Sequence, residues 1–162
     1  MAHLHRYAAT TTWVGNRGQG TADYKAYDRN HDIRVDGKPL LLCSSDPQFR
    51  GDRSRHNPEE LLVASLSGCH MLWYLHLCAV NGVVVTEYAD NAEGMMEEAA
   101  DGSGTFTEVT LKPHVVVSDR SMVEKADALH HEANKMCFIA SSVKFPVRHI
   151  PTIAVGESEK VL

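Results

Sequence analysis

The feature that most constrains the fold is a long stretch of chain without a charged side chain. No Asp, Glu, Lys or Arg occurs between Glu60 and Asn81, and most residues of this stretch are apolar. Strong helix-start signals precede it: Asn57 is a good N-cap, Pro58 suits the first helical position, and Glu60 completes a capping box. Asn81-Gly82 is a good left-handed stop. The sequence therefore predicts one helix from Pro58 to about Asn81 that is apolar on nearly all sides.

Such a helix must be buried, either in protein or in a membrane. A span of a bilayer takes about 20 apolar residues, so its length would suffice. The membrane interpretation is the weaker one, because the stretch contains two serines and two histidines and no basic cluster flanks it. At 1.5 Å per residue the helix would be roughly 35 Å long, which a chain of this size rarely encloses alone. We therefore expect a central helix covered in part by a second copy of the chain, in a homodimer without a membrane.

Length and charge narrow the class of protein. The 162 residues suit one domain, 1–162, and the net charge of −5 argues against a nucleic-acid partner. The N-terminus has no apolar signal core, so we expect a cytoplasmic protein. In that compartment cysteines remain thiols unless two of them are redox partners. The four cysteines are Cys43, Cys69, Cys78 and Cys137.

Neither the cysteines nor the histidines suggest a metal site. The cysteines are 26, 9 and 59 residues apart, whereas zinc sites use short paired spacings. The ten histidines are scattered, and the adjacent pair His130-His131 would point about 100° apart on a helix. We expect surface histidines, and neither a metal nor a cofactor.

The rest of the chain reads as strands and one further helix. Strands are expected at 5–14, 21–27, 33–35, 40–43, 83–91, 93–100, 105–117 and 146–155, and a helix from about 121 to 136. The first two strands would form a hairpin, and Pro113 suggests an edge position or a bulge. The tail from Gly156 is expected to be loose. Hairpins interrupted by two main helices indicate an α+β fold.

Cys69 lies in the middle of the apolar helix, beside Gly68, which would let another element come close. Burial raises the pKa of a thiol, so Cys69 would be inert without a nearby cation, and its own helix offers none. The candidate cations are Arg17 in a glycine-rich turn and Arg50, Arg53 and Arg55 in the long loop 44–56. Cys137 lies at the end of the second helix, 68 residues further on, and this spacing leaves open whether the two sulfurs meet. A buried structural cysteine is the alternative for each position.

Together these residues resemble a known family. The motif Asn57-Pro-Glu-Glu-Leu-Leu, Cys69 ten residues after Glu59, and the second cysteine at a helix end are similar to the OsmC/Ohr family of thiol peroxidases. The resemblance covers nearly the whole chain. It implies an α+β, OsmC-like fold, with antiparallel sheets wrapped around long central helices in an intertwined, obligate homodimer. Two active sites would lie at the subunit interface.

The resemblance also implies an activity, the reduction of organic hydroperoxides to alcohols. Cys69 would be the peroxidatic thiolate that becomes a sulfenic acid, and Cys137 would resolve it as an intrasubunit disulfide. Glu59 would orient an arginine beside the thiolate, and a dithiol or a lipoylated protein would be the reductant. Ten residues separate Glu59 from Cys69 by about 15 Å along one helix, so we expect Glu59 and its arginine to serve Cys69 of the partner subunit.

The arginine has two candidates. Arg17, in Gly-Asn-Arg-Gly, resembles the Ohr position and is slightly favoured, while Arg50 lies in the region from which the OsmC branch supplies its own. The segment around Arg50 resembles a less-studied branch. The chain also has Phe138 after Cys137, where the family usually has proline, and His70, where an apolar residue is usual.

Two further questions stay open at this level. His70 could donate a proton to the leaving alkoxide, although a packing role is the preferred interpretation. The main alternative function is a non-catalytic, stress-related dimer that holds a small hydrophobic ligand in the cavity around Cys69. A thiol-based redox sensor is a weaker alternative.

Overall fold

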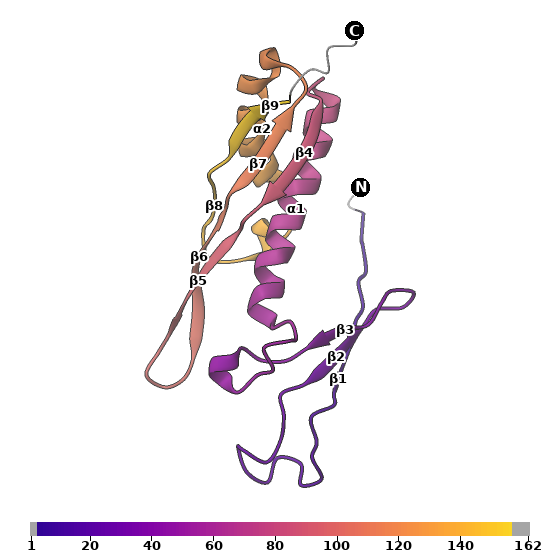
Figure 1. Cartoon of the computed structure of the whole chain (residues 1–162), viewed down its shortest axis with the longest axis vertical. Coiled ribbons are helices and arrows are strands. Elements are labelled where there is room, and N and C mark those ends of the chain that lie inside the picture. The colour runs from indigo at the N-terminus through magenta and orange to yellow at the C-terminus, as the bar shows by residue number, and fades with distance from the viewer. Residues whose placement is uncertain (1–2, 157–162) are drawn as a thin grey trace. The chain divides into compact units, whose positions relative to one another are not determined.

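The computed structural model describes residues 3–156, which combine nine strands with two long helices (Figure 1). The elements are β1 (Thr10–Trp13), β2 (His31–Arg34), β3 (Leu41–Cys43), α1 (Pro58–Val80), β4 (Val85–Asp90), β5 (Glu93–Glu98), β6 (Gly104–Leu111), β7 (Pro113–Val117), α2 (Val123–Met136), β8 (Val147–His149) and β9 (Thr152–Val155), with short 3-10 helices η1 (Pro47–Phe49), η2 (Arg120–Met122) and η3 (Ala140–Ser142). This mixture confirms the predicted α+β class. Except for Gly156, the tail predicted to be loose lies outside the described residues.

The chain forms two compact units, Met1–Leu62 and Val63–Leu162. In the first unit β1, β2 and β3 form an antiparallel sheet in that order, with Thr10 opposite Arg34 and Trp13 opposite His31. The prediction that the strand at 5–14 pairs with a strand at 21–27 is therefore wrong. The paired segment is shorter, and its partner comes later in the chain.

Arginine side chains explain why residues 21–27 are turns instead of a strand. Arg17 donates hydrogen bonds to the carbonyls of Lys25 and Ala26. Arg29 donates to the carbonyls of Tyr24 and Tyr27, and its guanidinium carbon lies 4.2 Å from the centroid of each of these tyrosine rings. These carbonyls would otherwise bond to a neighbouring strand.

Helix α1 begins and ends as predicted. The amide of Glu60 donates to Asn57 Oδ1 at 2.7 Å, and the amide of Asn57 donates to Glu60 Oε2 at 3.3 Å, which completes the capping box. At the other end Gly82 adopts a positive φ of 73°, and the Val83 amide donates to the Cys78 carbonyl at 2.9 Å. Because this left-handed conformation favours glycine, the helix ends at the predicted residue.

Within the single chain α1 is buried along one side only, and its predicted cover by a second copy stays a prediction. Its buried residues form one stripe with a spacing of four: Leu66, His70, Tyr74 and Cys78. Leu72 and Val80 remain 66% and 65% exposed. Helix α1 is long and apolar enough to cross a membrane by length and composition, a test that core helices of soluble proteins also pass. An apolar face of this kind is typical of a surface that another protein covers.

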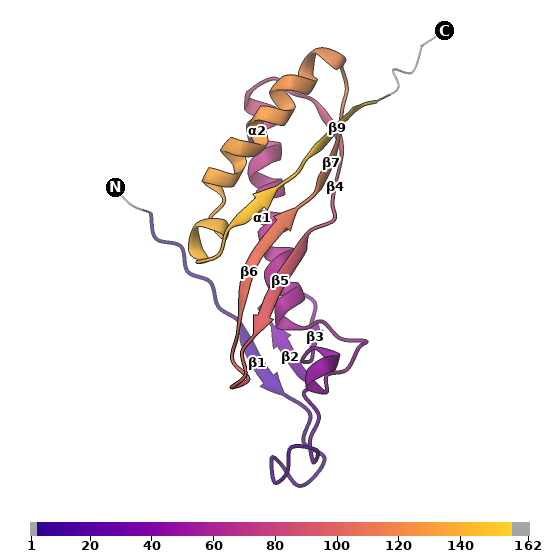
Figure 2. The ribbon, with the colours of Figure 1, turned by 90° about the vertical axis from the view of Figure 1, so that its left-hand side faces the viewer.

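The second unit contains two three-stranded sheets, ordered β4-β7-β9 and β5-β6-β8. β7 pairs antiparallel with β4 and parallel with β9, and the parallel connection runs through α2. Figure 2 shows α1 and α2 on the same side of these strands. Pro113 begins the central strand β7, so its predicted edge position is wrong. Proline is tolerated at the first position of a strand. The amide of the preceding residue, Lys112, donates to Asp90 Oδ1 at 2.6 Å.

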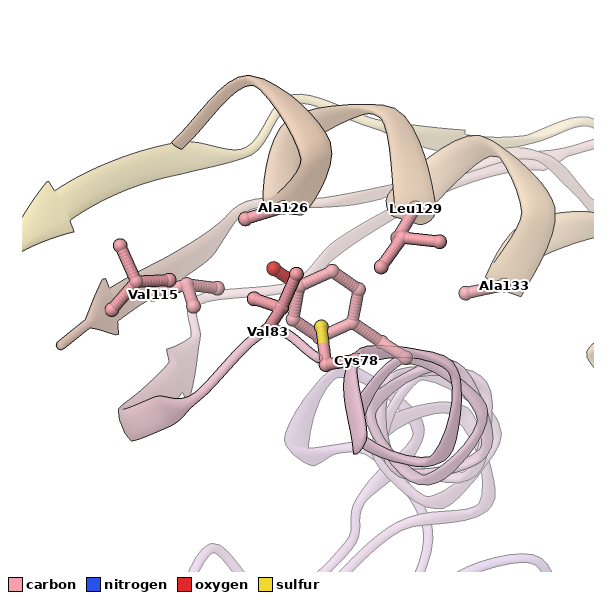
Figure 3. Close-up of a cluster of buried hydrophobic side chains, with 8 residues drawn as sticks. Cys78, Val83, Val115, Ala126, Leu129 and Ala133 are labelled. Carbon is pink, nitrogen blue, oxygen red and sulfur yellow. The ribbon is translucent and has the colours of Figure 1, made fainter. Parts of the chain in front are cut away.

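The core of the second unit lies where both helices meet the sheet (Figure 3). Helix α1 contributes Tyr74 and Cys78, and β7 contributes two valines, of which Val115 is labelled in the figure. Helix α2 contributes Ala126, Leu129 and Ala133. The two alanines let the helix backbone lie close to its neighbours, because their side chains end at Cβ. This packing holds α2 against α1. It thereby positions Cys69 within α1 and Cys137 directly after α2.

Candidate active site

The structure brings Cys69 and Cys137 together, which the sequence left open. Cys69 lies in the middle of α1 and is partly exposed, whereas Cys137 directly follows α2 and is 1% exposed. Their side chains lie close enough for Cys69 to influence the pKa of Cys137. Both are free thiols. Two helices that are distant in the sequence thus present their sulfurs to one another.

The backbone around Cys137 holds its sulfur in place. At this residue the chain leaves the helical conformation, with ψ at 112°. The Ala140 amide donates to Cys137 Sγ at 3.4 Å, and both the amide and the hydroxyl of Ser141 donate to the Cys137 carbonyl at 3.0 Å. The turn after α2 is therefore built around this cysteine.

The two thiols differ in surroundings. Burial raises the pKa of Cys137 to about 11, and the neighbouring Cys69 adds to that increase, while the Ala140 amide acts in the opposite direction. Cys137 is therefore a protonated thiol at neutral pH. Since the thiolate is the attacking form of cysteine, the partly exposed Cys69 is the sulfur suited to meet a reactant, and Cys137 is placed to meet Cys69.

An apolar pocket of about 630 Å³ lies over Cys69. One wall is the face of α1 from Ser65 to His76, and the other is the turn after α2, at Phe138 and Ile139. This size is within the usual range for small-molecule sites of roughly 300–1,000 Å³. The sulfur of Cys69 is thus available to an apolar molecule.

Three rings, those of Trp73, Phe138 and His76, contact one another in this pocket. Trp73 meets Phe138 edge to face, with centroids 5.4 Å apart and planes at 88°. Trp73 meets His76 in the same way, at 5.8 Å and 82°. Phe138 is 67% exposed, so its ring borders the pocket without being enclosed by the chain. We call Trp73 and Phe138 the aromatic wall.

The close approach predicted at Gly68 does not come from the described part of this chain. A Cβ atom at this position would meet nothing within 4 Å among the described residues, so no element of the chain uses the glycine for a close approach. Gly68 instead lines the pocket beside Cys69 and leaves room there.

Glu59 carries an unpaired polar atom. Its Oε2 is buried and has no hydrogen-bond partner among residues 3–156. A buried carboxylate oxygen is costly unless a donor or a cation meets it. The atom therefore leaves a place for a partner such as the predicted arginine, whose role beside Glu59 stays a prediction.

The two candidate arginines differ in how far the chain engages them. Arg17 donates to two carbonyls of its own loop and lies 3.7 Å from Asp28 Oδ1. Arg50 is exposed, sits in the left-handed region at φ 65°, and has its guanidinium carbon 5.9 Å from the centroid of the Tyr24 ring. Within residues 3–156 the Arg50 side chain forms no hydrogen bond or ion pair. These contacts favour Arg50 as the free cation, and the roles of both arginines stay predictions.

The contact between two histidines was missed by sequence reasoning. His70 and His130 are fully buried, and His70 Nε2 lies 3.0 Å from His130 Nδ1 in a hydrogen bond. The expectation of surface histidines is wrong for His130, whereas the packing role preferred for His70 agrees with its burial. A signal was present, because His70 lies at helical spacing between Leu66 and Tyr74, on the buried stripe of α1. Within the described chain, no group of three or more His, Cys, Asp or Glu side chains is arranged to hold a metal ion.

The position of His70 bears on its chemical role. Its ring faces α2 and is absent from the residues that line the pocket. Burial, with a smaller effect from His149, lowers the pKa of His70 to about 4, so the ring is neutral at pH 7. Both observations favour the packing role over proton donation to a molecule in the pocket.

Comparison with known proteins assigns the fold to a family. The family model described as "OsmC-like protein" matches residues 51–150. An OsmC-like protein of unknown function from Vibrio cholerae is 32% identical, with a TM-score of 0.83 over 92% of this chain and 100% of that one. No curated protein matches the chain.

Two more distant structures share the fold. Organic hydroperoxide resistance proteins from Elizabethkingia anophelis and Legionella pneumophila are 18% and 17% identical, both with a TM-score of 0.69. They match 96% and 95% of this chain and 100% of their own chains. The family model spans more than half of the sequence, and the Vibrio cholerae relative matches nearly all of it. The chain belongs to the OsmC-like family.

Proposed function

We propose that the protein is a thiol-dependent peroxidase that reduces organic hydroperoxides to alcohols. The observation that carries this proposal is the pair of Cys69 and Cys137, close enough for one thiol to shift the pKa of the other, beneath an apolar pocket. Two distant relatives of the same fold are named organic hydroperoxide resistance proteins, which agrees with it.

The first step is oxidation of Cys69. Its thiolate attacks the distal oxygen of the hydroperoxide, a sulfur–oxygen bond forms, and the oxygen–oxygen bond breaks. The sulfur is oxidised to a sulfenic acid, and the released alkoxide takes up a proton to become the alcohol. The apolar walls of the pocket suit an alkyl or aryl group on the hydroperoxide.

The second step is resolution by Cys137. Its sulfur attacks the sulfur of the sulfenic acid, the disulfide forms, and the hydroxyl group leaves with the proton of the Cys137 thiol as water. An external dithiol, either a small molecule or a lipoylated protein, then reduces the disulfide by exchange and is itself oxidised. This step needs the two sulfurs close together, and the effect of Cys69 on the pKa of Cys137 supports that placement.

Activation of Cys69 requires a cation beside its sulfur. We assign it to Arg50, because Arg17 is engaged by its own loop. The buried, unpaired Oε2 of Glu59 would orient that guanidinium, and the pair would serve Cys69 of the partner subunit. The exposed apolar face of α1 supports an intertwined homodimer, and four free thiols suit the cytoplasm.

The alternative is a non-catalytic, stress-related dimer that binds a small hydrophobic ligand. The size and apolar lining of the pocket would serve that function equally well. The two functions differ in what they require of the cysteines. Catalysis needs both sulfurs, whereas ligand binding needs only the shape of the pocket.

Consumption of tert-butyl hydroperoxide with dithiothreitol as reductant separates the two. We expect turnover by the natural protein, its loss in Cys69→Ser, and a sulfenic acid trapped by dimedone in Cys137→Ser. Cys78→Ala is the matched control, because Cys78 is a buried thiol in the same helix whose side chain belongs to the core. Peroxide consumption that is equal in all three variants and the natural protein would favour ligand binding.

A further inference from the structure

We propose that the hydrogen bond between His70 and His130 is a positioning device that holds Cys69 and Cys137 in the geometry for disulfide formation. The inference rests on the proposed function for its biological meaning. Its physical content is the geometry of two thiols, which can be measured without any peroxide.

Each histidine lies near one of the two cysteines along the chain. His70 directly follows Cys69 in α1. His130 precedes Cys137 by seven residues, or about 700° of rotation, so both lie on nearly the same face of α2, roughly 10 Å apart. A single side-chain bond between the helices therefore sets how the cysteine of one lies against the cysteine of the other.

The bond is strongly constrained by its surroundings. The rings of His70 and His130 are nearly parallel, at 5°, and Tyr74 stacks on His130 with centroids 3.8 Å apart and planes at 11°. The ring of His149 also stacks with His70, with centroids 5.7 Å apart. Rings held in this way cannot turn to find other partners, so one nitrogen of the pair donates and the other accepts.

The pair does not fit a purely stabilising role. His70 Nδ1 and His130 Nε2 are buried and have no hydrogen-bond partner within residues 3–156. Leaving polar atoms unpaired in an apolar interface is costly, and apolar residues of similar size would pack there more favourably. What the pair contributes is a fixed position of α2 relative to α1. Apolar packing tolerates small shifts of one helix along the other, whereas a hydrogen bond between them does not.

Disulfide formation needs such precision. A disulfide demands β-carbons roughly 3.5–4.5 Å apart and a torsion near 90° about the sulfur–sulfur bond. A displacement of about 1 Å between reacting groups can cost about a hundredfold in rate. The inference therefore places His70 and His130 as positioning residues for the resolution step, with no contact to substrate.

The test measures the effective concentration of the two thiols. Equilibration with oxidised and reduced dithiothreitol transfers two electrons and two protons between the reagent and the Cys69–Cys137 pair. The ratio of disulfide to dithiol protein at equilibrium reports how well the two sulfurs are placed. We expect His70→Leu and His130→Leu to lower the effective concentration about tenfold. His70→Gln, whose amide nitrogen can take the place of Nε2, is expected to restore most of it.

The matched control separates positioning from stability. Leu129→Ala removes apolar packing from the same helix contact and leaves the histidines in place, so it is expected to destabilise the fold without changing the effective concentration. An unchanged value in both leucine variants, or an equal loss in Leu129→Ala, would overturn the inference.

A second readout links the geometry to the proposed reaction. After one equivalent of hydroperoxide, His70→Leu should accumulate sulfenic acid that dimedone traps, while Cys69 is oxidised at the natural rate. If the natural protein shows no oxidation of Cys69 at all, the proposed function fails and the dithiothreitol equilibrium still decides the inference.

Discussion

Tyr74 of α1 and His130 of α2 stack face to face, with ring centroids 3.8 Å apart and planes 11° from parallel. This stack places an ionisable ring in the middle of the apolar contact between the two helices that carry the cysteines. Burial lowers the pKa of His130 to about 3, and the neighbouring His70 and His149 add to the effect. The contact between α1 and α2 therefore favours the neutral form of these histidine rings.

The first prediction is a loss of stability in mild acid. An unfolded histidine has a pKa near 6.5, and His70 and His130 fall to about 4 and about 3 in the folded chain. The unfolded state therefore binds more protons, so stability is fully present above pH 6.5 and falls as the pH drops toward 4. The expected slope is about 1.4 kcal/mol per pH unit for each histidine.

Urea unfolding between pH 7.5 and 4.5 checks this slope. The groups that face the pair are His149, whose own pKa burial lowers, and Asp127, whose charge opposes that shift. The double variant His70→Leu, His130→Leu is the control and should show a shallower dependence. A slope that is the same with and without the two histidines would contradict the assignment.

The second prediction concerns alkylation of the four thiols by iodoacetamide. At pH 8, Cys69 should react first, because it is partly exposed in the pocket, and Cys43 and Cys78 should be protected by burial. Cys137 should react only as the pH approaches 11 or the fold opens, because its pKa is about 11. Mass spectrometry of peptides after timed labelling gives the order.

Denaturation in urea supplies the reference in which all four thiols react alike. Fast labelling of Cys137 in the folded protein at pH 8 would show that its thiol is neither buried nor held by Cys69 and the Ala140 amide.

The third prediction uses the free space at Gly68. Alanine is favoured over glycine in a helix by about 1 kcal/mol, and a Cβ here meets nothing within 4 Å in the described chain. Gly68→Ala should therefore raise the free energy of unfolding by roughly 0.5–1 kcal/mol. Gly68→Leu should keep that stability but fill the pocket beside Cys69, and so slow the oxidation of Cys69 by bulky hydroperoxides.

Chemical unfolding and stopped-flow oxidation measure the two effects. If Gly68→Ala lowers stability, another copy of the chain approaches this glycine, and the space is an interface instead of part of the pocket.

The fourth prediction separates the two arginines. Arg17→Ala removes hydrogen bonds to Lys25 and Ala26 and an exposed ion pair with Asp28, so it should lower stability by about 1 kcal/mol or less. Arg50→Ala breaks no hydrogen bond or ion pair among the described residues and should lower the melting temperature no more than Arg17→Ala does. It should nevertheless slow the oxidation of Cys69 at least tenfold, because the thiolate loses its cation.

Thermal unfolding and the rate of sulfenic acid formation form the pair of measurements. The opposite pattern, with a stable but inactive Arg17→Ala, would return the role to Arg17.

Local signals in the sequence were enough for the parts of the fold that local interactions determine. The capping box of Asn57 and Glu60 and the left-handed Gly82 fix the ends of α1 through contacts within a few residues. The hairpin at 21–27 failed for the opposite reason. Its carbonyls bond to the side chains of Arg17 and Arg29, and nothing in strand propensity reports such contacts.

The site was predictable in its residues but not in its assembly. Spacing could not show that Cys69 and Cys137 meet, because that contact follows from the packing of α2 on α1. The bond between His70 and His130 was missed for the same reason, since the two lie 60 positions apart. The scattered positions of the histidines predicted exposed side chains, and only the helical spacing of His70 on the buried stripe of α1 indicated burial.

The aromatic wall leads to the last prediction, on substrate choice. Trp73 and Phe138 present their rings beside Cys69, and an aromatic pair contributes about 0.5–1.5 kcal/mol beyond its buried area. An aryl hydroperoxide should therefore gain more from the wall than an alkyl one. Phe138→Ala should lower kcat/KM for cumene hydroperoxide by roughly 2- to 10-fold more than for tert-butyl hydroperoxide, since 1.4 kcal/mol corresponds to about tenfold.

Phe138→Leu keeps an apolar side chain of similar reach and is the matched control for lost volume. It should restore the rate with tert-butyl hydroperoxide but only part of the rate with cumene hydroperoxide, because the leucine lacks the ring face. Equal losses for both peroxides in Phe138→Ala would mean that the ring supports the turn at Cys137 and takes no part in selecting the substrate.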